Sequence, residues 1–370
     1  MAKNILITCW FIDRMHGAVI YTAELGRYLS SLGYNVYCAG MAIDGKTAQF
    51  IRDSGVRVYR VDLLPMDIHY DIVWALHWPL LPYLIGKKLK YGRIVNACLS
   101  EFLPMERPLF FKENIDIILP LTDNLGETLK KQYGFGDNLI MTLSNTAPDE
   151  FFDVKKRLSS APKKIAVVSN HPPKELLNIE PLLKKKGVHI EYYGFWNNNS
   201  VRITPELLSE FDVIISIGKT VQYALAMGIP VYNYDYFGGS GYITPENIDI
   251  EQAHNFSGRS FRTKKTAKEI TDEIMSGYER ACADTIALKK IAGSRYKLSV
   301  RISEILKTLD KLPKKPPVKI TNDNRLYFDY CESMCVQSLM YEDTLASITW
   351  ARKKPRGLAR LWKHIRTFKF

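Results

Sequence analysis

No run of apolar residues in this chain is long enough to cross a membrane as a helix. Such a helix needs about 20 consecutive apolar residues. The longest apolar stretch here, residues 72–86, is interrupted by His77, Pro79 and Pro82. The chain opens directly on a predicted strand, without the apolar segment of a secretory signal peptide. We therefore expect a cytoplasmic protein.

Cysteine is scarce and scattered, with six residues in a chain of 370. Only Cys331 and Cys335 lie close together, at the spacing of one helical face, and no second pair accompanies them. This pattern matches neither a disulfide framework nor a zinc site. It is typical of a protein from a reducing compartment, which agrees with a cytoplasmic location.

Three common nucleotide- and metal-binding motifs are also missing. The sequence GKT at 218–220 is not a Walker A loop, because that loop needs a glycine where this chain has Val213. No G-x-G-x-x-G follows the first predicted strand, so the signal for a dinucleotide fingerprint is weak. The acidic residues form no D-x-D triplet and no tight cluster of ligands, so we expect no essential metal ion and no cofactor.

Acidic residues are outnumbered, and the formal net charge is +12. Much of the excess lies in residues 351–370, which hold eight Lys or Arg and no acid. From Gly357 onward this tail can form a helix with Trp362 and Phe368 among its apolar residues and cations on the other side. That composition is typical of a helix lying on an anionic membrane. A basic tail that frays or packs back on the protein is the alternative.

Nucleic acid is the other anion that a basic protein binds. Here, however, the basic residues are concentrated in one terminal tail, and no recognised RNA- or DNA-binding module accompanies it. We therefore expect no nucleic-acid partner.

Apolar runs and amphipathic segments alternate along the chain, which predicts an α/β fold with doubly wound parallel sheets. The predicted parts are an N-terminal Rossmann-like domain at 1–152, a linker at 153–164, a second Rossmann-like domain at 165–310 and an extension at 311–370. In the second domain we expect two consecutive helices, at 266–282 and 284–309.

The segment from Phe211 to Tyr242 is the most informative part of the second domain. Residues 213–217 are a near-continuous apolar run, as a strand buried on both faces requires. Gly218 allows a sharp turn into a short helix, and Lys219 and Thr220 stand at the N-terminus of that helix, where an anion is stabilised. A glycine-rich loop is predicted from Asp235 to Tyr242.

Within this segment, YALAMGIPV at 223–231 resembles the E-A-x-A-x-G-x-P-V motif of GT-B glycosyltransferases, which use nucleotide-activated sugars. The resemblance extends over residues 1 to about 305. Among these enzymes, the chain resembles the family 4 or group 1 glycosyltransferases of bacterial surface-polysaccharide synthesis. It implies two Rossmann-like domains with a cleft between them, the first for the acceptor and the second for the donor.

The chain departs from that family at the positions of its donor-binding residues. The family carries two glutamates around this helix, and the matching residues here are Ile215 and Tyr223. The family's Arg and Lys after the first strand of the second domain are replaced by a segment with Asn170, His171 and Lys174.

The resemblance implies a site for the nucleotide diphosphate on the second domain. The leaving diphosphate needs cations, helix N-termini or backbone amides, because negative charge develops there in the transition state. Arg259 is included because guanidinium pairs well with phosphate. The candidate donor-binding residues are Asn170, His171, Lys174, Gly194, Gly218, Lys219, Thr220, Gly238, Gly239 and Arg259.

Acceptor-side and catalytic candidates come from the first domain. Arg14, His16 and Gly17 lie in its first strand–helix loop and are placed on the acceptor side. An inverting enzyme needs a base for the acceptor hydroxyl, whereas a retaining enzyme needs no such base. The candidate catalytic residues, each at a predicted strand end, are His77, Asp13 and Glu101.

The sequence thus predicts a glycosyltransferase that moves a sugar from a nucleotide-diphosphate sugar to a lipid-linked or surface-polysaccharide acceptor, of lipopolysaccharide, O-antigen or capsule type. It would work on the inner face of the cell membrane, held there through residues 351–370. Two alternatives stay open. One is a non-catalytic homologue that binds glycan or a partner enzyme, and the other is a nucleotide-sugar epimerase or hydrolase.

Overall fold

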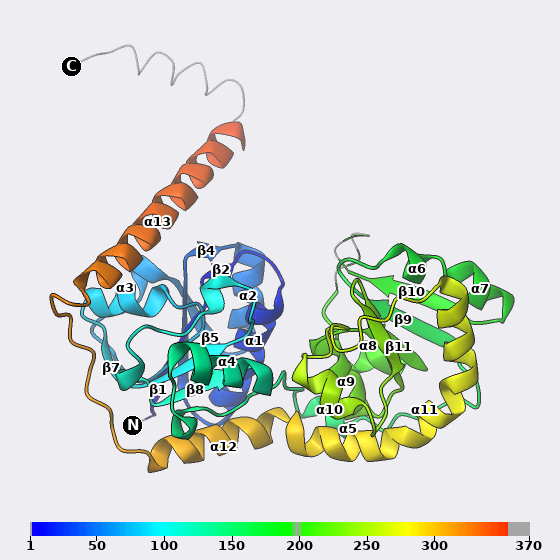
Figure 1. Cartoon of the computed structure of the whole chain (residues 1–370). Helices are drawn as coiled ribbons and strands as arrows, with labels where there is room; N and C mark the ends of the chain where they lie inside the picture. Colours follow the sequence, from blue (N-terminus) through cyan, green and yellow to red (C-terminus); the bar gives the residue numbers. More distant parts are fainter. Residues whose placement is uncertain (1, 195, 197–198, 200, 354–370) are drawn as a thin grey trace. The chain divides into compact units, whose positions relative to one another are not determined.

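The structure is a computed structural model that describes residues 2–194, 196, 199 and 201–353 (Figure 1). The chain divides by its internal contacts into two compact units. The described residues up to Gly92 and from Pro316 onward form the first unit, and Arg93–Lys315 form the second. Most of the basic tail at 351–370 falls outside the described residues.

In the first unit, four parallel strands lie in the order β5-β3-β1-β6. Their bounds are Asn4–Thr8 for β1, Asn35–Gly40 for β3, Val56–Arg60 for β5 and His69–Ala75 for β6. Ile5 of β1 pairs with Val36 on one side and with Ile72 on the other. All three side chains are buried, as expected for strands that are covered on both faces.

Helices and short elements complete the first unit. They are β2 (Phe11–Ile12), α1 (Gly17–Ser31), β4 (Ala42–Ile43), α2 (Gly45–Arg52), the 3₁₀ turn η1 (Val61–Leu63), α3 (Leu80–Gly86) and α13 (Arg325–Lys353). α13 packs against α3, and Cys331 and Cys335 are buried on its packed side (Figure 1). No helix in the part of the chain that is described combines the length and the apolar character needed to span a bilayer.

The second unit contains a five-stranded sheet in the order β10-β9-β11-β12-β13. The bounds are Lys164–Val168 for β9, His189–Tyr193 for β10, Val213–Ser216 for β11, Val231–Asp235 for β12 and Gly238–Tyr242 for β13. The first four strands run parallel, and β13 is an antiparallel edge strand. The same unit holds β8 (Ile117–Pro120) and all of β7 (Lys90–Cys98) from Arg93 onward, and these two strands pair in parallel.

The helices of this unit are α4 (Asp123–Tyr133), α5 (Glu150–Asp153), α6 (Lys174–Leu177), α7 (Glu180–Lys185), α8 (Pro205–Ser209), α9 (Lys219–Met227), α10 (Ile248–Ala253), α11 (Ala267–Arg295) and α12 (Leu298–Lys311). Three 3₁₀ turns are η2 (Pro104–Glu106), η3 (Lys112–Asn114) and η4 (Asp137–Leu139).

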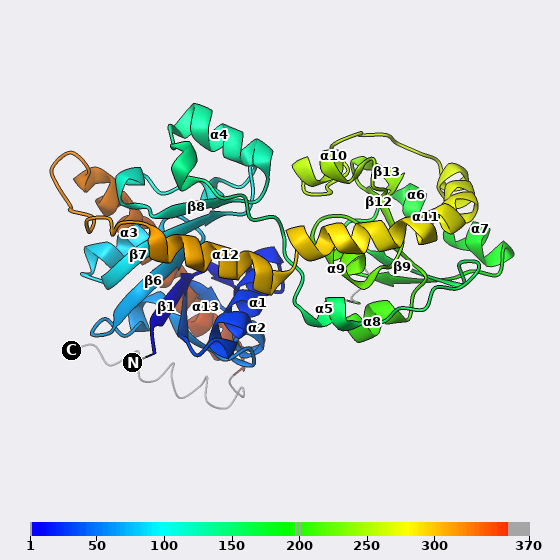
Figure 2. The same ribbon diagram turned by 90° about the horizontal axis from the view of Figure 1, so that it is seen from below.

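Two apolar cores cover the two faces of the five-stranded sheet. Ala166 and Ile214 belong to the core with α5, α8 and α9. Ile165 and Val213, one residue earlier on the same strands, belong to the core with α6, α7 and the first turns of α11. This alternation is the period of two expected of strands. α11 contacts α7, α9 and β13 (Figure 2), so it packs against two helices and against the edge strand of this sheet.

Two sequence-based expectations for this unit are wrong. The two helices expected at 266–282 and 284–309 are one helix to Arg295 and a second that begins at Leu298, because buried Tyr296 ends the first. The glycine-rich segment after Asp235 is not an open loop, because residues 238–242 pair with β12. The predicted class, parallel α/β with Rossmann-like sheets, is confirmed.

Candidate functional site

A pocket of about 650 Å³ opens at the carboxyl ends of β9, β11 and β12. Ligands of open parallel α/β sheets bind at this edge, because the strand-to-helix loops gather there. Its lining comes from three segments of the chain and consists of Val168, Ser169, Asn170, His171, Ser216, Ile217, Thr220, Asp235, Tyr236 and Phe237. The predicted donor residues Asn170, His171 and Thr220 are therefore brought together.

Ser169 connects two of these segments through hydrogen bonds. Its Oγ donates to Asp235 Oδ2 at 2.8 Å and accepts the backbone N–H of His171 at 3.1 Å. Asn170 and His171 are exposed on the turn that follows. These two hydrogen bonds hold the turn after β9 in place. The side chains of Asn170 and His171 line the pocket and remain exposed.

Asp235 is the carboxylate of the pocket, and sequence reasoning did not select it. Its side chain is only 4% exposed. Oδ1 accepts the backbone N–H of Tyr236 at 2.8 Å, in addition to the bond from Ser169. Burial raises the pKa of the Asp235 carboxyl, and the two hydrogen bonds oppose that rise. An acid at the end of a buried strand was the signal available in the sequence.

The turn between β11 and α9 supplies the helix N-terminus that the sequence predicted. Gly218 is the N-cap residue with φ 58° and ψ −136°, a conformation that side-chain-bearing residues rarely adopt. Its N–H donates to the carbonyl of Phe256 at 3.2 Å. Thr220, in the first turn of the nine-residue α9, lines the pocket. Free N–H groups and the helix dipole at this end favour an anion.

Lys219 is placed differently from its neighbour Thr220. Its Nζ donates to the carbonyl of Thr146 at 3.0 Å and lies 5.4 Å from the centre of the Tyr223 ring. Lys219 is not among the residues that line the pocket. Its assignment to the diphosphate stays a prediction.

Tyr236 and Phe237 form the aromatic rim of the pocket, with exposed fractions of 63% and 36%. They form the tight connection between β12 and β13. Gly238 has φ 89°, and a side chain on Gly239 would collide with the carbonyl oxygen of Asn233. These two predicted donor residues therefore permit the hairpin that presents the rim, and neither lines the pocket.

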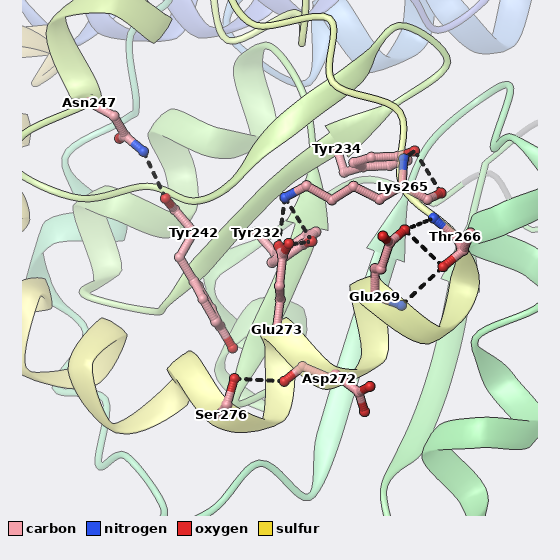
Figure 3. Close-up of polar contacts among 10 residues, drawn as sticks. All are labelled: Tyr232, Tyr234, Tyr242, Asn247, Lys265, Thr266, Glu269, Asp272, Glu273 and Ser276. Atoms are coloured by element: carbon pink, nitrogen blue, oxygen red, sulfur yellow. Dashed lines mark hydrogen bonds and ion pairs between the residues drawn. The ribbon is translucent and has the colours of Figure 1, made fainter.

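A polar cluster fixes β12 to the start of α11 (Figure 3). Tyr232 donates its hydroxyl to Glu273 Oε2 at 2.7 Å, and Lys265 Nζ lies 2.6 Å from the same oxygen. Tyr234 accepts the N–H of Lys265 at 2.9 Å. Thr266 and Glu269 cap each other at the first turn of the helix. The bonds of Tyr232 and Tyr234 to residues 265 and 273 thus hold β12, the strand that ends in Asp235.

Two further donor candidates lie outside the lining. Lys174 is exposed at the first position of α6. Gly194 follows β10, where its α-carbon approaches the carbonyl of Ser169 so closely that no side chain would fit. Ile215 and Tyr223, which the sequence analysis matched to two glutamates of the resembled family, are core residues. Tyr223 stacks on Phe151 with ring centres 4.3 Å apart.

Arg259 and Glu101 line a second, smaller pocket of about 130 Å³ in the same unit. The guanidinium carbon of Arg259 lies 4.0 Å from the ring centre of Phe237 and 4.5 Å from that of Phe102. Glu101 Oε1 accepts the hydroxyl proton of Thr122 at 3.2 Å. The sequence grouped Arg259 with the donor and Glu101 with catalysis, and the structure places both in this pocket.

The remaining candidates lie in the first unit, around the end of β6. Trp10 donates its backbone N–H to Nδ1 of buried His77 at 2.8 Å, so neutral His77 carries its proton on Nε2. His16 Nε2 donates to the carbonyl of Phe11 at 3.1 Å, which leaves Nδ1 of neutral His16 as an acceptor. Asp13 Oδ1 lies 4.0 Å from His16 Nε2.

The protonation of His16 follows from its surroundings. Burial and then His77 lower the pKa of His16 from its usual 6.5, so the ring is neutral near pH 7. Gly17 is the first residue of α1, with open space where a side chain would stand. Arg14 is exposed beside it. Of the two histidines, His16 therefore has the geometry of a proton acceptor.

Among the described residues, no cluster of three or more His, Cys, Asp or Glu side chains could hold a metal ion. The hydrogen-bonding groups of the first pocket suit a polar organic ligand. The absence of a metal requirement stays a prediction from the sequence.

No protein-family model matches the chain, and no curated protein matches it. Solved structures do. A glycosyltransferase from Rickettsia africae ESF-5 is 15% identical with a TM-score of 0.55, covering 84% of this chain and 100% of that one. Arabidopsis thaliana UGT89C1 is 9% identical with a TM-score of 0.52, covering 84% and 98%. The lipopolysaccharide outer core galactosyltransferase WaaB, in its apo form, is 12% identical with a TM-score of 0.50, covering 84% and 100%. The chain therefore has the fold of these glycosyltransferases, the GT-B fold predicted from its sequence.

Proposed function

We propose that the protein is a glycosyltransferase that takes a sugar from a nucleotide-diphosphate sugar. The observation that carries the proposal is the pocket at the carboxyl ends of β9, β11 and β12. It combines the N-terminus of α9, a buried carboxylate and an aromatic rim within about 650 Å³. That volume lies in the range of small-molecule sites. The solved glycosyltransferases with this fold support the same reading.

In this proposal the diphosphate binds at Thr220 and the first N–H groups of α9. The helix terminus stabilises the charge that develops on the leaving diphosphate, which lowers the transition-state energy. Asn170 and His171 at the pocket mouth donate further hydrogen bonds. Asp235 accepts hydrogen bonds from hydroxyl or amide N–H groups of the donor, since a second anion would repel its carboxylate.

The transfer step needs a group that receives the proton of the acceptor hydroxyl, if the reaction inverts the anomeric centre. The hydroxyl oxygen forms a bond to the anomeric carbon, the bond to the diphosphate breaks, and the proton passes to the base. We assign this role to His16, because its Nδ1 is an acceptor when the ring is neutral.

We further propose that the acceptor is a lipid-linked or surface polysaccharide on the inner face of the cell membrane. The basic residues of 351–370 support contact with anionic lipid. The described helix that leads into them, α13, exposes large apolar side chains, among them Leu326, Tyr330, Met340 and Tyr341. These residues would bury their apolar surface at the lipid boundary. WaaB, named as a lipopolysaccharide galactosyltransferase, has the same fold.

A thermal-shift screen against UDP, GDP, dTDP, CMP and ADP and their sugar conjugates tests the donor. One nucleotide should raise the melting temperature, because a ligand that binds only the folded state stabilises it by mass action. Thr220→Val should reduce that shift while leaving the melting temperature without ligand nearly unchanged. If no nucleotide produces a shift, the enzyme proposal fails and a non-catalytic glycan-binding role becomes the better explanation.

A further inference from the structure

The second pocket holds an arginine whose hydrogen-bonding capacity is unused. The guanidinium carbon of Arg259 lies over the phenyl rings of Phe237 and Phe102, 4.0 Å and 4.5 Å from their centres. In the part of the chain that the structure describes, its N–H groups make no hydrogen bond and no ion pair. A half-buried arginine with five donors and no partner is unusual, because guanidinium pairs readily with carboxylate and phosphate.

The two ring contacts limit the positions that the Arg259 side chain can take. Contact with two rings covers part of the guanidinium, and its five N–H donors lie in the guanidinium plane. The cation–π contacts also restrict the rotamers, so little further entropy is lost when an acceptor binds. Arg259 is thus held at its pocket, where its donors can pair with a planar or tetrahedral oxyanion.

The surrounding charges leave this cation uncompensated. Glu101 lines the same pocket, but its carboxylate accepts a bond from Thr122 and makes no ion pair with Arg259 among the described residues. Burial, then Arg262, lowers the pKa of Arg259, whereas Glu101 raises it. The local balance is therefore positive.

The backbone around Arg259 shows the strain that often marks ligand sites. Asn255 and Phe256 have φ of 53° and 52°, a region that residues with bulky side chains rarely occupy. Asn145 holds this conformation by donating to Asn255 Oδ1 at 2.9 Å. Ser257, in the same segment, has a buried hydroxyl without a hydrogen-bond partner within the described residues, and it lines the pocket.

We propose that this pocket binds an acidic group, a carboxylate or a phosphate, on the acceptor sugar, with Arg259 as the residue that selects for it. The volume of about 130 Å³ admits such a group with part of a sugar ring. Phe237 lines the donor pocket on one side and stacks on Arg259 on the other, so an acceptor held by its acidic group lies next to the donor. The inference rests on the proposed function, because it names the class of acceptor.

The test measures binding of three small probes, D-glucuronate, D-glucose 6-phosphate and D-glucose, at matched ionic strength. Calorimetry or ligand-observed NMR gives the affinities of the wild type. Binding of glucuronate alone identifies a carboxylate, and binding of the 6-phosphate alone identifies a phosphate. Binding of all three with equal affinity overturns the inference, because the pocket then recognises hydroxyl groups.

Arg259→Gln should weaken the acidic probe about tenfold or more, as expected for the loss of a charge-assisted hydrogen bond. Arg259→Lys keeps the charge but not the planar fork, and should give an intermediate affinity. Arg262→Gln is the matched control, since Arg262 is an exposed neighbour that does not line the pocket. Equal binding by wild type and Arg259→Gln, with both folded by circular dichroism, overturns the inference.

The same variants separate this inference from the donor proposal. Nucleotide binding depends on the first pocket, so a nucleotide-induced shift that persists in Arg259→Gln assigns Arg259 to the acceptor. If that shift disappears instead, Arg259 belongs to the donor site and the inference is overturned. If wild type binds the acidic probe but no nucleotide, the donor proposal fails while the anion pocket stands.

Discussion

Ser169 and Asp235 stand at the ends of two strands, β9 and β12, that are not neighbours in the sheet, and the 2.8 Å bond between them passes over the end of β11. The bond thus links the ends of β9 and β12 across β11, and all three strand ends contribute to the lining of the larger pocket. It also places a buried carboxylate where a negatively charged donor is proposed to bind. That arrangement costs stability, because burial disfavours the ionised carboxyl, and residues that lower stability in a pocket are candidates for binding.

Removing the hydroxyl of Ser169 tests the bond directly. In Ser169→Ala one oxygen of Asp235 loses its donor, and we expect the free energy of unfolding to fall by about 1–3 kcal/mol. Urea unfolding measures the change. Ser276→Ala is the control, because its exposed hydroxyl bonds only to the Asp272 carbonyl of its own helix at 2.8 Å, and a change within about 0.5 kcal/mol is expected. Equal effects of the two substitutions would contradict the structural role of the Ser169–Asp235 bond.

Asp235 should also give stability a specific dependence on pH. Its pKa is raised above the usual 3.8 by burial, so between the two values the folded protein binds more protons than the unfolded chain. The contribution of Asp235 to stability is therefore largest at low pH and declines as the pH rises through that window. Asp235→Asn removes the titration, and the variant should gain stability relative to wild type as the pH increases.

Urea unfolding of both proteins at a series of pH values measures this difference. A stability difference that stays constant with pH, or that changes in the opposite direction, would show that the carboxyl is not buried as the structure describes. Asp235→Asn should also weaken donor binding at pH values where the ionised carboxylate of the wild type accepts a hydrogen bond from the donor. A change in stability alone would not explain this weaker binding.

Gly239 provides a test of the hairpin that carries the aromatic rim. A methyl group at this position would collide with the carbonyl of Asn233, and we expect Gly239→Ala to reduce the free energy of unfolding by about 1–3 kcal/mol or more. Gly293 in α11 is the matched control. A side chain there has open space, so Gly293→Ala should be neutral or should stabilise by up to about 1 kcal/mol. A neutral Gly239→Ala would mean that β13 does not pair with β12.

Much of the fold could be predicted because its signals are local. The apolar run at 213–217 and the glycine at 218 lie within a few residues of each other, and both kept their predicted roles as buried strand and turn. The glycines after Asp235 were predicted as a loop, because glycine is depleted in strands. The structure uses them in an edge strand instead, where the partner backbone comes too close for side chains.

The candidate site depends on contacts between distant residues, which a single sequence does not reveal. Ser169 and Asp235 are 66 positions apart, and nothing near either residue indicates the other. Lys219 was selected for its place at a helix N-terminus, yet its Nζ bonds to Thr146, 73 positions earlier. The stacking of Arg259 on two phenyl rings is equally non-local. The local sequence pattern thus predicted that the site lies at the carboxyl ends of the strands. The contacts between the side chains could be found only from the structure.

His16 should control the acidic side of the pH–rate profile of transfer, once a donor is known. Burial and His77 lower its pKa below 6.5, so the neutral form that accepts a proton persists to lower pH than for an unperturbed histidine. We expect an acidic limb in kcat/KM with an apparent pKa below 6.5. His16→Asn should lower kcat by about 10²- to 10⁴-fold. The control is His189→Asn on the exposed surface of β10, which should leave the rate unchanged.

The basic tail gives the last prediction, which concerns location. Full-length protein should sediment with vesicles that contain anionic phospholipid and should remain in solution with zwitterionic vesicles, because the attraction to the surface is electrostatic. Deletion of residues 351–370 removes eight of the basic residues, and binding should be lost. Replacing Met340 and Tyr341 by Glu, in the full-length chain, tests whether the exposed face of α13 contributes apolar contact. If the truncated protein sediments as the full chain does, the tail is not the anchor. If the α13 variant alone loses binding, the helix face carries the contact instead.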